Sequence, residues 1–286
     1  MSALRTAFFA VFVSSAVIAT APLTRPSAQA SVSATPWTEL HASRTRLVAG
    51  RTKTASGHYL AGLEIVMADG WKTYWRTPGD SGVPPTFDWT GSANVATTRV
   101  LYPAPMRMPE AGGVAIGYKQ SVLLPIEVTP QDAAKPVTLK LTLEFGVCRE
   151  ICIPATANFD LSIPAAAAGA PAPEIAAAIE RVPRPQQSRR KGDPALERVG
   201  VTLDGSAPKL TIEASFAGDG KNADVFIEAP EGYYVPIPAR VAAVAAGVIR
   251  FETDLGGDLA QDLKGKTLTF TLVSDAGATE AQWTFP

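Results

Sequence analysis

The feature that most constrains the fold is a strict alternation of apolar and polar residues. Over residues 137–145 (VTLKLTLEF), every odd-numbered residue is apolar and every even-numbered residue is polar. Successive side chains of an extended strand point to opposite faces, so this period of two places one face in a core and the other in water. Similar strands are expected over 45–52, 59–67, 96–102, 122–128 and 157–163. Turn signals such as 68–70 (ADG) and 78–80 (PGD) separate them, and this favours an antiparallel β-sandwich.

The strand pattern resumes after a Pro/Ala-rich stretch. Residues 164–173 (PAAAAGAPAP) have the composition of a linker, and residues 174–182 predict a short helix that Pro183 ends. Further strands are expected over 209–216, 224–229, 248–253, 267–273 and 281–285. We therefore predict an all-β fold of two immunoglobulin-like antiparallel β-sandwiches, over 31–164 and 196–286. A Pro/Ala-rich linker with a short helix, over 165–195, joins them.

The amino-terminal residues 1–30 predict a cleavable signal peptide. Arg5 supplies the positive charge, residues 7–21 form an apolar core, and 28–30 (AQA) are a small-x-small cleavage site. The apolar run is about 15 residues long, shorter than the ~20 needed to span a bilayer. We therefore expect a periplasmic protein that does not itself span the membrane, in a compartment that permits disulfides.

Composition excludes several classes of function. Lys plus Arg number 26 and Asp plus Glu 27, so a formal net charge of -1 offers no electrostatic footprint for nucleic acid. The two histidines have no motif-like spacing to the cysteines, and no Gly-rich oxyanion loop is apparent, which argues against a Cys/His protease. The predicted second sandwich holds no Cys or His, so its expected role is docking or spacing. No cofactor or metal is expected.

The two cysteines, Cys148 and Cys152, follow directly on the alternating strand. In an extended chain their α-carbons would lie about 13 Å apart, whereas a disulfide needs roughly 4.4–6.8 Å. A turn or one helical loop must therefore intervene if they pair. Such a small ring would contribute only about 2 kcal/mol by loop entropy, against ~4.7 for a loop of a hundred residues. It suits thiol–disulfide exchange better than stabilisation, although an idle structural disulfide is an open alternative.

A metal-binding function is the main competitor from another class. Two thiolates, with Met106 and Met108 elsewhere in the sequence, are soft ligands of the kind that suit Cu(I). The plainer interpretation is a loop whose methionines fill gaps in the core.

Several stretches resemble the amino-terminal periplasmic domain of the disulfide-interchange protein DsbD and its ScsB-type relatives. They are GWKTYWR (70–76), PGDSG (78–82), PPTFDW (84–89), YPAP (102–105), GYK (117–119), LPI (124–126) and FGVCREICIP (145–154). The resemblance covers about 37–164. The second half resembles the extra β-domain of the ScsB-type relatives only in pattern.

The resemblance implies a redox-active cysteine pair. In the family, such a pair takes electrons from a membrane-embedded reductase and passes them to exported thioredoxin-like proteins. Cys152 would form the mixed disulfides and Cys148 would resolve them. The spacing here is Cys-x3-Cys, whereas the best-known DsbD pattern has five intervening residues, so the ring and its reduction potential are expected to differ.

The resemblance also implies a cap loop that shields the pair between encounters. By position this loop would be 112–119, including Gly117, Tyr118 and Lys119, with Tyr118 as the aromatic lid. The alternative for Tyr118 is an ordinary half-buried loop tyrosine. The aromatic residues of 71–75 are expected to pack the sandwich instead of contacting a partner.

The sequence shows neither a membrane electron-transfer segment nor a thioredoxin-like domain. We therefore expect a separate membrane protein to donate electrons, a periplasmic thioredoxin-like protein to accept them, and this chain to act as an electron-relay module. Whether it is itself a protein-disulfide reductase stays open. The alternatives are a Cu(I)-handling periplasmic protein and a β-sandwich adaptor with a structural disulfide.

Overall fold

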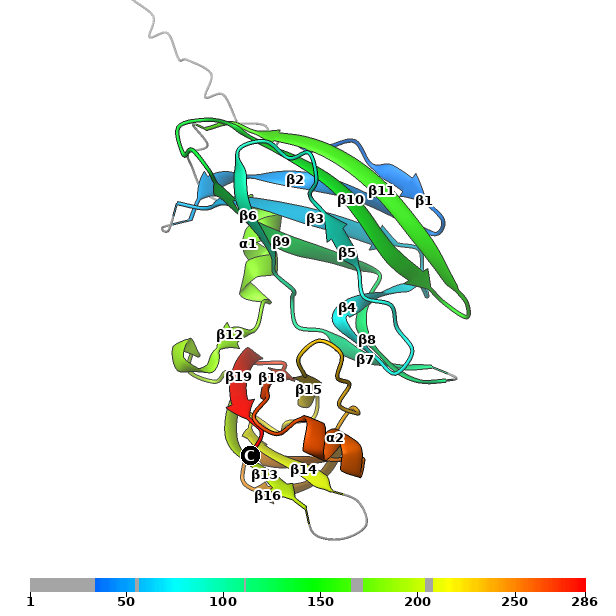
Figure 1. Ribbon diagram of the computed structural model, residues 1–286, viewed down its shortest axis with the longest axis vertical. Helices are drawn as coiled ribbons and strands as arrows, with labels where there is room; N and C mark the ends of the chain where they lie inside the picture. Colours follow the sequence, from blue (N-terminus) through cyan, green and yellow to red (C-terminus); the bar gives the residue numbers. More distant parts are fainter. Residues whose placement is uncertain (1–33, 55–56, 111, 166–171, 204–207) are drawn as a thin grey trace, which may run out of the picture. The chain divides into compact units, whose positions relative to one another are not determined.

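The computed structural model describes residues 34–54, 57–110, 112–165, 172–203 and 208–286. The predicted signal peptide and much of the predicted linker (166–171) lie outside the described residues. The described part consists mainly of strands, which form two β-sandwiches with short helices between and within them (Figure 1). The predicted all-β fold is therefore confirmed.

The first sandwich is made of a five-stranded and a six-stranded sheet. The five-stranded sheet has the order β1 (Thr38–Leu40), β2 (Ser43–Lys53), β3 (Tyr59–Met67), β9 (Ser121–Pro130) and β6 (Val95–Val100). The six-stranded sheet has the order β11 (Cys152–Ile163), β10 (Val137–Cys148), β4 (Lys72–Gly79), β8 (Gly113–Lys119) and β7 (Met106–Glu110), and β5 (Thr86–Asp88) pairs with β10.

The alternating segment forms β10, as its period predicts. Its buried residues are Val137, Leu139, Leu141, Leu143 and Phe145. The intervening Lys140 and Glu144 are exposed. Strand β11 repeats this alternation and pairs with β10 along its full length, so the two strands form one long hairpin (Figure 1). Their apolar side chains share one core with those of β3 and β9 from the other sheet, and this places the cysteines at the end of the hairpin.

Strands β7 and β8 correct two expectations. Residues 112–119 were expected to form a cap loop, and 106–108 a loop, yet 113–119 and 106–108 lie in the six-stranded sheet, where β8 is paired with β4 on one side and β7 on the other. The segment GVAIGYK is apolar without alternation, and four consecutive residues of it are buried. A strand covered on both faces has no polar face to reveal its period, so the alternation test missed it.

The second sandwich has two four-stranded sheets. One has the order β12 (Arg184–Pro185), β19 (Gly277–Thr284), β18 (Thr267–Ser274) and β15 (Asp224–Glu228). The other has the order β13 (Ala195–Thr202), β14 (Lys209–Ser215), β17 (Val248–Asp254) and β16 (Ala239–Ala245). The short β12–β19 pairing is parallel, whereas the other pairings of these two sheets are antiparallel.

The predicted helix is α1 (Pro173–Glu180), which begins with a proline, a residue favoured in the first turn. Ile175 on its buried face packs against Val48 and Leu60 of the five-stranded sheet. A 3-10 turn, η1 (Gln186–Ser188), and a second helix, α2 (Gly257–Asp262), complete the fold. None of the helices in the described part is long and apolar enough to cross a membrane.

The packing of β10 makes a testable prediction about stability. Leu139→Ala should lower the free energy of unfolding by about 2–5 kcal/mol, because it removes buried methyl groups and leaves a cavity. Lys140→Ala, the neighbouring change on the exposed face, should alter it by about 0.5 kcal/mol or less. Urea unfolding of the oxidised protein, followed by tryptophan fluorescence, measures both. Equal losses in the two variants would contradict the assignment of faces.

Candidate functional site

The cysteine pair closes the end of the β10–β11 hairpin. Cys148 is the last residue of β10, Cys152 is the first of β11, and the two lie directly opposite each other in the ladder. Residues 149–151 make the turn, in which the Arg149 amide donates to the Ile151 carbonyl at 3.1 Å. The α-carbons are 4.1 Å apart and the sulfurs form a disulfide. The intervening turn that the sequence required is therefore a β-hairpin.

The two sulfur-bearing residues differ sharply in accessibility. Cys148 is 1% exposed and packs with Tyr74, Met108 and Ala115. It is enclosed because β10 has a neighbour on each side there, with Lys72 of β4 opposite Cys148. Cys152 is exposed, because β11 forms the edge of the sheet. An incoming thiolate can therefore reach Cys152 more readily than Cys148.

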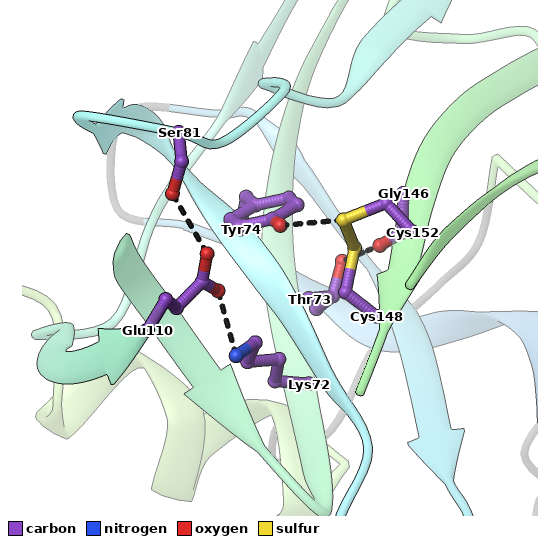
Figure 2. The surroundings of a disulfide bond; sticks show 8 residues. All are labelled: Lys72, Thr73, Tyr74, Ser81, Glu110, Gly146, Cys148 and Cys152. Atoms are coloured by element: carbon purple, nitrogen blue, oxygen red, sulfur yellow. Dashed lines mark hydrogen bonds and ion pairs between the residues drawn. A yellow bond between two sulfur atoms is a disulfide. The ribbon is translucent and has the colours of Figure 1, made fainter. Parts of the chain in front are cut away.

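Tyr74 of β4 makes a direct polar contact with the disulfide. Its hydroxyl lies 2.9 Å from the Sγ of Cys152, and Figure 2 shows the hydroxyl directed at that sulfur. A disulfide sulfur carries no proton, so the tyrosine is the donor. Burial, helped by the negative charge of Glu110, raises the pKa of Tyr74 to about 12. The phenol consequently stays protonated, and able to donate, throughout the physiological pH range.

Glu110 of β7 lies on the other side of Tyr74 from the disulfide and is held from two directions (Figure 2). The Lys72 ammonium lies 2.6 Å from one carboxylate oxygen, and the Ser81 hydroxyl donates to the other at 2.7 Å. Burial opposes ionisation, but the hydrogen bonds from Lys72 and Ser81 and the lysine charge outweigh it and lower the pKa of Glu110. The carboxylate therefore stays charged and helps to keep Tyr74 neutral.

Gly117, expected in a cap loop, instead allows β8 to approach β4 beside the site. A Cβ at this position would collide with the Thr73 carbonyl oxygen and lie 2.8 Å from the Cα of Tyr74. Thr73 in turn donates its hydroxyl to the Gly146 carbonyl at 2.9 Å, which links β4 to β10. A glycine inside a strand often marks such a close approach of two backbones.

Tyr118 and Lys119 also belong to strand β8 and not to a loop. Tyr118 is a core residue, 3% exposed, and its hydroxyl donates to the Pro103 carbonyl at 2.7 Å. Lys119 is exposed at the end of β8. Tyr118 therefore packs in the core and does not form the expected lid.

The space beside Cys152 is a groove of about 300 Å³. It is lined by Tyr74, Val83, Pro84, Thr86, Glu144, Phe145, Gly146, Cys152, Pro154, Ala155 and Thr156. Val83 and Pro84 come from the loop after β4, and neither was among the predicted site residues. The Pro and Gly residues of this loop indicate only a turn, and they do not indicate that the apolar side chain of Val83 is 60% exposed.

The described residues offer no ready metal centre of the usual kind. No three His, Cys, Asp or Glu side chains in that part of the chain are grouped so that they could hold an ion. Met108 joins the buried cluster that contains Cys148, whereas Met106 is exposed.

The first sandwich thus carries a hairpin disulfide with one sulfur exposed and one buried, an arrangement that thiol–disulfide exchange can use. Residues 45–164 match the family described as "Thiol:disulfide interchange protein DsbD, N-terminal". The matched residues cover most of the first sandwich, which is therefore similar to a domain of the DsbD amino-terminal type. Residues 181–286 match a second family, described as a domain of unknown function, DUF8393.

The whole two-sandwich arrangement has a counterpart among solved structures. The chain is similar to the N-terminal periplasmic domain of ScsB from Proteus mirabilis, at 27% sequence identity and a TM-score of 0.68. The similarity covers 89% of this chain and 99% of the ScsB chain. No curated protein matches the sequence.

The tyrosine contact predicts how the reactive cysteine responds to pH. In the reduced protein, the Tyr74 hydroxyl should stabilise a Cys152 thiolate, since hydrogen bonds to charged acceptors are the stronger ones. Tyr74→Phe should therefore raise the pH midpoint of Cys152 alkylation by iodoacetamide by about one unit. Tyr118→Phe is the matched control, because it removes a buried hydroxyl of the same sheet that bonds to Pro103. An unchanged midpoint in Tyr74→Phe, or an equal shift in both variants, would contradict the role of Tyr74.

Proposed function

We propose that this protein relays reducing equivalents through Cys148 and Cys152 by thiol–disulfide exchange in the periplasm. A separate membrane-embedded protein would donate the electrons, and periplasmic thioredoxin-like proteins would accept them. The observation that carries the proposal is the asymmetric disulfide: an exposed Cys152 is joined to a buried Cys148 on a DsbD-type domain. The similarity to a periplasmic domain of ScsB supports the compartment.

Reduction of the relay begins at the exposed sulfur. A donor thiolate attacks Cys152, the bond between Cys152 and Cys148 breaks, and Cys148 leaves with the electron pair as a thiolate. The second donor thiolate then attacks the donor sulfur of the mixed disulfide and releases Cys152. The donor ends as a disulfide, and the relay holds two electrons as a dithiol after uptake of protons from water.

Delivery reverses these steps on the acceptor. The Cys152 thiolate attacks the acceptor disulfide, and one acceptor cysteine leaves as a thiolate. Cys148 then attacks Cys152 within the mixed disulfide, which restores the intramolecular bond and releases the acceptor as a dithiol. The Tyr74 hydroxyl, 2.9 Å from the Cys152 sulfur, is placed to stabilise negative charge whenever Cys152 is the leaving or attacking group.

The surface around Cys152 suits a protein partner. Ile151 in the hairpin turn is 67% exposed, and Val83 across the groove is also exposed. Exposed apolar side chains beside a reactive group are typical of an interaction site. The flanking Arg149 and Glu150 are exposed and lie 3.7 Å apart, so their charges largely offset each other.

Trapping distinguishes the roles of the two cysteines. A periplasmic thioredoxin-like protein with a single active-site cysteine, activated as its thionitrobenzoate mixed disulfide, serves as the acceptor. Cys148→Ala should form a stable mixed disulfide through Cys152, because no resolving thiol remains. Cys152→Ala should react at about one tenth of that rate or below, because the access and the thiolate character of the remaining cysteine govern the rate. Non-reducing electrophoresis and thionitrobenzoate release measure both.

The two variants each retain one thiol, so they control for each other. Faster trapping through Cys148 would reverse the assigned roles. If neither variant reacts faster than its unfolded form, the disulfide is structural and the relay is wrong.

A second candidate is Cu(I) handling, which one contact favours. Met108 belongs to the same buried cluster as Cys148, so a thioether lies in the same part of the core as the cysteine pair. In the reduced protein, two thiolates and this thioether form a soft donor set of the kind that Cu(I) selects. Met106 lies on the surface and would not contribute.

Anaerobic titration with Cu(I) tests this candidate. The reduced protein should bind one Cu(I) more tightly than the Cys148→Ala/Cys152→Ala protein, and Met108→Leu should weaken binding about tenfold if the thioether is a ligand. Met106→Leu is the control and should have no effect. Affinity equal to that of the protein without cysteines would dispose of copper handling.

A further inference from the structure

The two sandwiches belong to one compact unit, in which the second sandwich contacts the strand that carries Tyr74. Arg76 of β4 donates from Nε and Nη2 to the two carboxylate oxygens of Glu228, each at 2.7 Å, and Nη2 also contacts Glu280. The Thr77 hydroxyl donates to Glu228 at 3.1 Å. Paired hydrogen bonds between a guanidinium and a carboxylate fix the orientation of both groups. This part of β4 is therefore held by the second sandwich.

Strand β7 is held in a similar way. The Nε of Arg107 donates to Asp224 of β15, at 2.8 and 2.6 Å to the two oxygens. Its Nη2 donates to the Pro238 carbonyl at 2.6 Å. Arg107 directly precedes Met108, which belongs to the same buried cluster as Cys148.

A third contact holds the loop that lines the groove. The Tyr234 hydroxyl of the second sandwich donates to Asp80, and the other oxygen of Asp80 accepts from the Val114 amide at 2.9 Å. Asp80 directly precedes Ser81, which bonds to Glu110, and lies three residues before Val83 of the groove. All three contacts thus end within three residues of a side chain in the disulfide site.

Within the first sandwich, few ladder pairings hold strand β4 in place. Strand β4 pairs with β10 only at Lys72 opposite Cys148. Its pairing with β8 covers 72–74 and resumes at Gly79 after a break in register. Residues 75–78 are therefore outside the ladder, and this is the stretch that the second sandwich contacts through Arg76 and Thr77. The side chain of Trp75 in the same stretch packs against Phe226, with ring centroids 5.9 Å apart.

We propose that the second sandwich acts as a brace that sets the geometry of the disulfide site. Through Glu228, Asp224 and Tyr234 it fixes β4, β7 and the groove loop, and so holds Tyr74 against Cys152. Arg76, Arg107 and Asp80 are then positioning residues for exchange. The inference rests on the proposed function and assigns a role to the domain of unknown function.

The test uses the full mature chain with Glu228→Gln and, separately, Tyr234→Phe. Each change is nearly isosteric, and the second lies at a partly exposed side chain, so at least one folded variant is expected. The pH profile of Cys152 alkylation in the reduced protein is the measurement. Both variants should shift the profile upward in the same sense as Tyr74→Phe, slowing alkylation at neutral pH by about threefold or more.

Glu213→Gln is the matched control. Glu213 is also a carboxylate held by two arginines, Arg198 and Arg250, but all three lie within the second sandwich. This change should leave the alkylation profile unaltered even if it lowers the melting temperature. A shift as large as that of Glu228→Gln would mean that general destabilisation, and not the brace, moves the profile.

A double-mutant cycle tests the route of the effect. If the brace acts by placing the Tyr74 hydroxyl, Glu228→Gln should have little further effect in a Tyr74→Phe background. Full additivity, or no shift in either Glu228→Gln or Tyr234→Phe, would overturn the proposal.

The outcome is separable from that of the relay itself. If the wild-type protein transfers electrons to a thioredoxin-like acceptor but the variants leave the alkylation profile unchanged, the brace is wrong and the relay stands. If the variants shift the alkylation profile but the wild-type protein transfers no electrons, the brace stands and the relay is wrong.

Discussion

The register that places Cys148 opposite Cys152 is the constraint on which the rest of the site depends. Because the two strands pair along their full length, the cysteines meet at the end of the hairpin without any helical loop. The same register makes the sulfurs unequal, since β10 is an inner strand there and β11 is an edge. Cys152 is thereby accessible to solvent while Cys148 is buried, and the proposed exchange would use this difference in access.

Strand β4 connects this asymmetry to the rest of the molecule. Tyr74 contacts the exposed cysteine, and Arg76, two residues along, is bound by the acidic residues of the second sandwich. A strand with so short a pairing to β10 needs other contacts to hold its side chains in place. In the proposed brace, the two sandwiches act together, because contacts from the second sandwich hold the strand that carries Tyr74.

Local sequence patterns predicted part of this structure. The features that depend on contacts between residues far apart in the sequence could not be predicted from such patterns. The alternation of 137–145 predicted β10 because one face is wet, and the separation of the cysteines predicted that a turn must lie between them. Strand β8 has no solvent-exposed face, so alternation did not predict it, and the family resemblance implied a cap loop with Tyr118 as its lid where the chain forms a buried strand. Tyr74 was expected only to pack, because its contact with Cys152 depends on strand pairing. Arg76 and Glu228 are 152 residues apart, beyond any local pattern.

The reduction potential of the Cys148–Cys152 pair tests the central claim most directly. Equilibration of the protein with glutathione redox buffers, followed by quantification of free thiols, gives this value. The relay predicts a potential of about -180 to -270 mV, in the range of disulfides that exchange with thioredoxin-like proteins. A potential well below about -300 mV is characteristic of structural disulfides and would contradict the account.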